Sequence, residues 1–424
     1  MGARRQPAIE ITLNGRETLV AAPGSGGRYA LSAAGIASAK SAADARIHRD
    51  RDDLVDLSHR IHGDPELGFE EHHAAGWICE ILHDAGFAVE TGVGELPTAF
   101  TASYGTGPLT VAVCAEYDAL PDVGHACGHN VIAASAVGAG LALASVVDDL
   151  GLTVKVIGCP AEENGGGKVL LLDRGVFDGV HAAMMVHPSP DEDPAPRTLA
   201  ISDIGVTYRG KAAHASGYPE RGINAADALS IGQVALAMLR QHILPEERIH
   251  GITTHGGEAP NIIPALATAV YYMRAASLVK LRELEPRVRR CFEAGALATG
   301  CEIEIAEVCP AYSEFEPDAD LVELYRANAT TIGRPAFKRR GALGSTDMAN
   351  VSLTIPTIQP MVSIECAGSS NHQPEFATHC AGPSADRAIV EGGLSMAWTA
   401  IDLATNPALR ARLMAGQRSV LAFD

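Results

Sequence analysis

The sequence predicts an α/β protein with a mainly parallel sheet that is covered by helices on both faces. A smaller α+β domain is expected to be inserted into the chain of this α/β domain. Three observations lead to this prediction. Continuously apolar segments alternate with helical patterns in the first half of the chain, as buried parallel strands do. The middle of the chain follows a β-α-β-β-α-β order, which is typical of a ferredoxin-like unit. The length of 424 residues favours more than one domain.

The first helical pattern begins near residue 46. Residues 1–45 are rich in glycine, alanine and serine and lack strong periodicity, so we expect an N-terminal extension there. Leu54, Leu57 and Ile61 then recur at a spacing of three to four residues, and a second helix is expected over 74–85. These helices open the larger domain, for which we expect 46–197 as the first part.

Three buried strands are expected in this first part, at residues 109–115, 152–159 and 182–186. A buried helix is expected over 131–147 and a short one near 169–172. The longer helix contains glycine and serine and is too short to span a membrane, which needs about 20 residues. Functional side chains of such sheets gather beyond the C-terminal ends of the strands.

The inserted domain is expected over 198–316. Its predicted strands are 198–208, 248–255, 268–275 and 302–308, and its predicted helices are 225–241 and 279–299. After Pro317 the pattern returns to that of the larger domain, so 317–424 is expected to be its second part, with a closing helix near 395–404.

The overall charge argues against two classes of partner. The net charge is -18 and the acidic residues are spread along the chain, whereas binding to nucleic acid or to an anionic membrane needs a positive surface.

The nine cysteines are scattered and form no C-x-x-C pair, which indicates a reducing, cytoplasmic setting. Arg4 and Arg5 are not followed by an apolar segment, so no secretory signal is expected.

Chemically reactive side chains follow the expected strands. Cys127 and His129 come two residues apart after the first strand, and Gly128 between them permits a tight backbone path. Thiolate and imidazole are preferred zinc ligands, although this pair taken alone is more simply explained by a buried cysteine and a capping histidine.

Three further signals come later in the chain. Glu162 and Glu163 follow the second strand, where one carboxylate can bind a metal and the other can carry a proton; alternatively they are a solvated pair at a helix N-terminus. His187 ends the third strand, and His372 lies in a polar loop. Each signal is weak alone, but their occurrence at successive strand ends predicts a metal site.

Several segments together resemble a known family of metallopeptidase-like enzymes. The segments DALP, HACGHN, PAEE followed by GGGK, the HP that ends a strand, and GSTDMANVS are similar to motifs of the aminoacylases and bacterial glutamate carboxypeptidases. The similarity is greatest to the branch with indole-acetyl-amino-acid hydrolases, p-aminobenzoyl-glutamate hydrolase and β-alanyl-lysine-type dipeptidases. It extends from about Leu57 to beyond His372 and implies a zinc-peptidase-like catalytic domain with a lid and dimerisation domain inserted into it.

The resemblance also implies roles for individual residues. The implied metal ligands are Cys127, His129, Glu163, His187 and His372. Glu162 is the implied general base, and Asp118 is expected to orient a ligand. Distant members have histidine where Glu116 stands, and many relatives have aspartate where Asn130 stands.

The inserted domain adds three residues to this set. The resemblance implies that His214 reaches the active site of a partner subunit. Without the resemblance, His214 would be interpreted as a loop histidine that follows a strand. Asn261 and Arg274 are implied to contact the substrate. The guanidinium of Arg274 suits a carboxylate, whereas a surface position on a strand is the alternative.

The predicted function is metal-dependent hydrolysis of an amide bond in an N-acyl-amino acid or dipeptide-like substrate, with release of a free amino acid. The resemblance implies two divalent metal ions, and the ligand types favour Zn²⁺, with Mn²⁺ or Co²⁺ compatible. The resemblance at His214 also implies a homodimer. Two alternatives remain open: a non-catalytic metal-containing binding protein of the same fold, and a protein with structural zinc whose function lies elsewhere.

Overall fold

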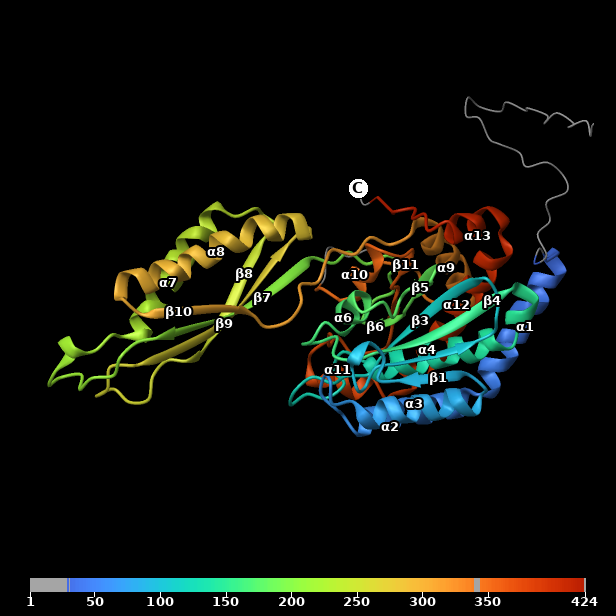
Figure 1. The fold of residues 1–424 in the computed structure, drawn as a ribbon. Helices are drawn as coiled ribbons and strands as arrows, with labels where there is room; N and C mark the ends of the chain where they lie inside the picture. Colours follow the sequence, from blue (N-terminus) through green and yellow to red (C-terminus); the bar gives the residue numbers. More distant parts are fainter. Residues whose placement is uncertain (1–28, 30, 339–343, 423–424) are drawn as a thin grey trace, which may run out of the picture.

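The computed structural model describes Tyr29, residues 31–338 and residues 344–422. It has a larger α/β part and a smaller α+β part that is inserted into it (Figure 1). The chain enters the smaller part after β6 (His187–Ser189) and returns to the larger one before α9 (Ala319–Ile332). This architecture confirms the predicted fold class.

The larger part is built on a six-stranded sheet of mixed direction. Three of its strand pairs are parallel and two are antiparallel. The antiparallel pairs involve the two strands at one edge, which were not predicted; β1 in particular is short and mostly exposed, so it lacks a buried apolar pattern. In spatial order the strands are β1 (Ala88–Thr91), β2 (Phe100–Tyr104), β4 (Leu152–Cys159), β3 (Leu109–Glu116), β5 (Ala182–Met184) and β11 (Thr357–Ile358).

Helices cover both faces of this sheet. Val111 and Val113 of β3 face the core formed with α4 and α12, whereas Ala112 and Cys114 face the core formed with α6 and α10. Strands buried on both sides read as continuous apolar segments, which is why β3 and β4 were visible in the sequence. The helices are α1 (Ala33–Arg49), α2 (Arg51–Gly63), α3 (His72–Asp84), α4 (His129–Ala144), α5 (Val147–Leu150), α6 (Gly167–Asp173), α9, α10 (Met348–Ser352), α11 (Pro374–His379), α12 (Pro383–Thr405) and α13 (Pro407–Met414). A two-stranded sheet joins β6 to β12 (Met361–Ser363).

Helix α1 corrects one expectation about the N-terminus. It starts well before residue 46, where the larger domain was expected to begin, and the Ser32 side chain caps it by accepting a hydrogen bond from the Gly35 amide. Ala39, Ala43 and Ile47 are buried, and the helix packs against α4 and α12. The apolar stripe of α1 is made mostly of alanines, so its periodicity is faint in the sequence. Residues 1–28 of the expected extension lie outside the described residues.

The smaller part is a four-stranded antiparallel sheet with two helices on one face. The sheet order is β10-β7-β9-β8, as in a ferredoxin-like unit. The side chains of Asn224 and Ser277 cap the two helices. The elements are β7 (Ala200–Arg209), α7 (Ala225–Leu239), β8 (Arg248–His255), β9 (Leu266–Ala275), α8 (Leu278–Thr299) and β10 (Glu302–Glu307).

The sheet of the smaller part has one face without helices. Ala200, Ile204 and Met273 point into the core under α7 and α8. Because side chains alternate along a strand, the residues between them point to the opposite face.

No helix within the described ranges is long and apolar enough to cross a membrane.

Candidate metal centre

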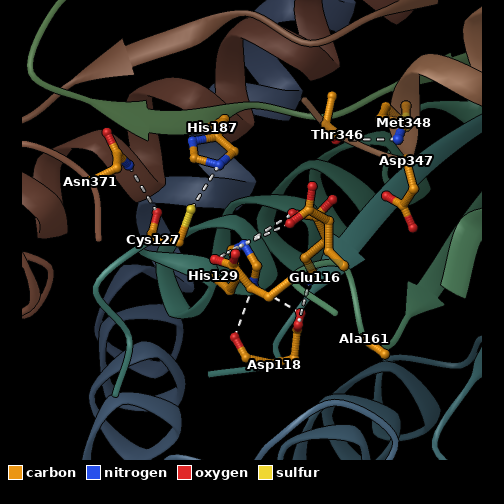
Figure 2. A network of polar contacts seen from close by, with 12 residues as sticks. Glu116, Asp118, Cys127, His129, Ala161, His187, Thr346, Asp347, Met348 and Asn371 are labelled. Atoms are coloured by element: carbon orange, nitrogen blue, oxygen red, sulfur yellow. Dashed lines mark hydrogen bonds and ion pairs between the residues drawn. The ribbon is translucent and has the colours of Figure 1, made fainter. Parts of the chain in front are cut away.

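The end of β3 and the start of α4 position the first two candidate ligands. Gly128 precedes α4 with a φ of +81°, and a Cβ atom there would lie 2.4 Å from Cγ of Pro188. Only glycine fits this position, because it tolerates positive φ and has no Cβ. The resulting turn leaves Cys127 and His129 side by side in the same buried region (Figure 2).

The five candidate ligands converge on one place. Cys127 Sγ lies 3.4 Å from Nε2 of His187, and Nε2 of His372 lies 3.5 Å from Oε1 of Glu163. Donor atoms of Cys127, His129 and His187 all lie within 4.8 Å of one another, and so do those of Cys127, Glu163 and His372. The two groups share the Cys127 thiol.

Asp118 lies directly behind His129. Its Oδ1 atom is 2.9 Å from Nδ1 of His129, and its Oδ2 atom accepts a hydrogen bond from the Glu163 amide (Figure 2). Burial acts against ionisation of Asp118, but His129 outweighs it and lowers the pKa of this carboxyl. By contacting Nδ1, Asp118 orients the His129 imidazole so that its Nε2 atom faces the cluster. Asp118 also fixes the backbone at Glu163.

Hydrogen bonds to the backbone around Glu162 hold this residue beside the cluster. The preceding residue, Ala161, has a φ of +55°, and its amide donates a hydrogen bond to the buried Glu71 carboxylate at 2.8 Å. Tyr312 Oη donates to the Glu162 carbonyl. Burial, with the neighbouring carboxylates of Glu116 and Glu163, raises the pKa of the Glu162 side chain well above its usual range. A carboxyl with a raised pKa is suited to exchanging protons near neutral pH.

The ligand atoms of these five side chains are suited to divalent cations. Nε2 of His129 and Oε1 of Glu163 are buried and have no hydrogen-bond partner among the described residues, which is costly unless a cation satisfies them. Burial keeps the pKa of His187 low, at about 4, so its imidazole is neutral and able to bind metal. Burial and Glu163 raise the pKa of the Cys127 thiol, so the thiolate form needs a cation nearby.

A second set of buried charges lies behind the candidate ligands and was not predicted. Lys168 Nζ lies 2.5 Å from Oε1 of Glu116 and 2.5 Å from Oδ1 of Asp347, and all three side chains are fully buried. Burial disfavours the ammonium form, but Asp347 and Glu116 raise the pKa of Lys168 well above its usual value. Glu116, which stands where distant family members have histidine, is therefore paired with a lysine.

A cavity of about 480 Å³ opens over the cluster. Cys127, Glu162, Glu163, His187 and His372 line it, and so does Arg274 from β9 of the smaller part. The structure therefore brings four of the five predicted ligands, the predicted base and one predicted substrate-binding residue to the same cavity, with the fifth ligand, His129, buried beside them.

His214 and Asn261 lie elsewhere within the chain. β7 leaves the larger part at Ala200 and runs for ten residues, a length of roughly 30 Å at about 3.3 Å per residue. His214 follows its far end and forms an isolated β-bridge with Ile262, and both His214 and Asn261 are exposed. The loops that carry them form the tip of the smaller part farthest from the larger one (Figure 1). Within one chain, Asn261 therefore lies apart from the cavity that Arg274 lines.

A buried thiol, three imidazoles and paired carboxylates around one cavity define a metal-dependent hydrolase as the class of protein. Residues 112–385 match the family described as Peptidase family M20/M25/M40. The Xaa-Arg dipeptidase of Mus musculus is 38% identical over 397 residues, which cover 89% of this chain and 92% of the relative. One of the subunits of the p-aminobenzoyl-glutamate hydrolase of Escherichia coli K12 is 34% identical, covering 69% of this chain and 65% of the relative. The chain belongs to this peptidase family.

A solved structure extends the similarity to the fold. The Bacillus subtilis YXEP protein, described as a dinuclear metal binding peptidase of the M20 family, superposes with a TM-score of 0.64 at 21% identity, covering 84% of this chain and 99% of that one. The predicted family and the predicted metal-dependent amide hydrolase are confirmed. The alternative of a non-catalytic binding protein finds no support among these relatives.

Proposed function

We propose that this chain hydrolyses dipeptides or N-acyl-amino acids that end in a free carboxylate and releases the C-terminal amino acid. The observation that carries the proposal is the pair of donor groups that overlap at Cys127 beside Glu162, in the cavity that also contains Arg274. The names of the relatives support it, since a dipeptidase and an aminobenzoyl-glutamate hydrolase both split an amide bond to an amino acid.

Cys127, His129, Glu163, His187 and His372 would hold two divalent cations. When bound, these cations supply Lewis acidity that favours hydroxide over water at neutral pH. Thiolate and imidazole favour Zn²⁺, and the Glu163 carboxylate also admits Mn²⁺ or Co²⁺. Because the Cys127 thiol must stay reduced to bind metal, and because all nine cysteines are free thiols, we assign the protein to a reducing compartment such as the cytoplasm.

Glu162 acts as the general base and then as the general acid. Its carboxylate takes the proton of the attacking water and delivers it to the nitrogen of the departing amino acid. The hydrogen bonds from the Ala161 amide to Glu71 and from Tyr312 to the Glu162 carbonyl fix the backbone, so the side chain keeps its position while its charge changes. Asp118 contributes by orienting His129 rather than by touching the substrate.

Arg274 binds the carboxylate of the substrate. Its Nη1 atom donates to Ser345 Oγ at 2.8 Å and its Nε atom to His250 at 3.3 Å. No acidic side chain within the described ranges pairs with this half-buried guanidinium, although it lines the cavity. A planar guanidinium binds a carboxylate with two parallel hydrogen bonds.

The active unit is a homodimer in which His214 and Asn261 complete the cavity of the partner subunit. Nδ1 of His214 accepts hydrogen bonds from the amides of Ser216 and Gly217, so the neutral imidazole carries its proton on Nε2. This exposed N–H can donate to a carbonyl oxygen that becomes negative during attack. Within one chain the distance along β7 separates His214 from the cavity, and a second copy removes that separation.

The proposal is tested by a screen of dipeptides and N-acyl-amino acids with free amino acid as the readout. We expect turnover that stops after dialysis against a chelator and returns when Zn²⁺, Mn²⁺ or Co²⁺ is added to the still folded protein. Far-ultraviolet circular dichroism reports whether the dialysed chain stays folded. Amino acid release that continues in the fully demetallated, folded protein would contradict the proposal.

A further inference from the structure

The helix-free face of the smaller sheet carries a buried carboxylate, Asp203 of β7. Asp203 is only 6% exposed. Its Oδ1 atom accepts hydrogen bonds from the amide of Cys309 at 3.1 Å and from the Cys309 thiol at 3.4 Å. No lysine, arginine or histidine among the described residues forms an ion pair with it. A buried carboxylate without a cationic partner is unfavourable, so its presence calls for an explanation.

Asp203 lines a small cavity next to the candidate metal centre. This side pocket has a volume of about 40 Å³, which is room for about three water molecules. It shares lining residues with the central cavity, including Glu163, Tyr272 and Tyr312. A substrate group that enters the central cavity therefore has a route to the Asp203 carboxylate.

The strand register sets the position of Asp203 relative to Arg274. β7 and β9 are antiparallel, with Asp203 opposite Tyr272 and Ile201 opposite Arg274. Asp203 and Arg274 are therefore diagonal neighbours on the same face of the sheet. Such neighbours lie roughly 7–8 Å apart, a span that the side chain of arginine or lysine can cover.

We propose that Asp203 determines specificity by binding the cationic side chain of the amino acid whose carboxylate is held by Arg274. The substrate class is thus a dipeptide or acylated amino acid that ends in arginine, lysine or a similar cationic residue. This inference rests on the proposed function, because it uses the carboxylate site at Arg274. The guanidinium or ammonium group would supply the positive charge that Asp203 lacks within the chain.

A purely structural role for Asp203 makes a different prediction. The amide of Cys309 needs only a hydrogen-bond acceptor, and the side-chain oxygen of asparagine provides one. Asp203→Asn therefore keeps this contact and the side-chain volume while it removes the charge. If Asp203 only held the Cys309 loop, this substitution would leave the preference between substrates unchanged.

The experiment compares alanyl-arginine with alanyl-citrulline, in which a neutral urea group replaces the guanidinium. In the metal-loaded full-length protein we expect kcat/KM to be about 10- to 100-fold higher for the arginine dipeptide, as loss of one charged hydrogen bond implies. Asp203→Asn should remove this preference and change the citrulline rate by less than about threefold. Asp203→Glu should restore part of it, which a structural role would not predict.

Glu304→Gln is the matched control. Glu304 lies opposite Thr207 on the same face of the sheet, is exposed, and does not line either cavity. It undergoes the same change of charge and should keep the wild-type preference. Thermal unfolding followed by circular dichroism checks that each variant is folded.

The outcomes separate this inference from the function on which it rests. An equal rate for both dipeptides in the wild type, or an unchanged preference in Asp203→Asn, overturns the role of Asp203. Hydrolysis of p-aminobenzoyl-glutamate without hydrolysis of either dipeptide also overturns it and leaves the proposed function intact. Absence of amino acid release from every compound of the screen refutes the proposed function itself.

Discussion

Replacing Glu162 with glutamine is expected to lower kcat by about 10²- to 10⁴-fold while the metal content stays unchanged. Glutamine has the shape of glutamate but cannot take up the proton of the attacking water. The five candidate ligands do not include Glu162, so metal binding should persist. Rates of amino acid release and elemental analysis of the same preparation measure the two quantities.

The adjacent residue provides the control for this prediction. Glu163→Gln makes the same chemical change one position later, but Glu163 is a candidate ligand whose Oε1 atom lies 3.5 Å from His372. We expect this variant to lose metal together with activity. If Glu162→Gln lost metal and Glu163→Gln kept it, the two roles would have to be exchanged.

Replacing His214 with alanine is expected to lower kcat by about 10²- to 10³-fold, as removal of a hydrogen-bond donor to a developing oxyanion does. The side chain is exposed and, among the described residues, accepts hydrogen bonds only from its own loop, so the protein should stay folded. A role within the same chain would be hard to reconcile with the length of β7. The loss should therefore be reversible by a second copy of the chain.

Mixing the His214→Ala and Glu162→Gln proteins tests whether His214 acts across subunits. In a mixed dimer, one cavity combines an intact Glu162 with the intact His214 of the partner, and the other cavity lacks both. Random exchange makes about half of the dimers mixed, so the mixture should recover about a quarter of the wild-type activity. No recovery after verified subunit exchange, or full activity of His214→Ala alone, would contradict the dimeric site.

The sequence was most informative where burial is complete. β4 has the predicted bounds, because its mostly apolar residues leave little ambiguity. β8 also has the predicted bounds, although most of its residues are exposed. The candidate ligands were visible because strand ends concentrate functional side chains. Helix α1 was missed because alanine gives little contrast with the polar residues around it. Edge strand β1 was missed because it buries almost nothing.

Contacts between distant segments could not be predicted from spacing. Lys168 and Asp347 are 179 positions apart, and only the folded sheet brings them to Glu116. Asp203 looked like an ordinary strand residue, because neither its burial nor the register that sets it diagonal to Arg274 is encoded locally. His214 and Asn261 are separated from the cavity by the length of β7. The sequence indicated how long this strand is, but it did not indicate that the strand runs away from the cavity.

The central claim is that five side chains from four separate segments bind a pair of divalent cations. Elemental analysis of the purified wild-type protein after removal of loosely bound metal tests it most directly. We predict about two divalent ions per chain, and a loss of metal in Cys127→Ala, because Cys127 belongs to both donor groups. A folded, active wild-type protein without stoichiometric metal, or a Cys127→Ala variant that keeps both ions, would contradict the account.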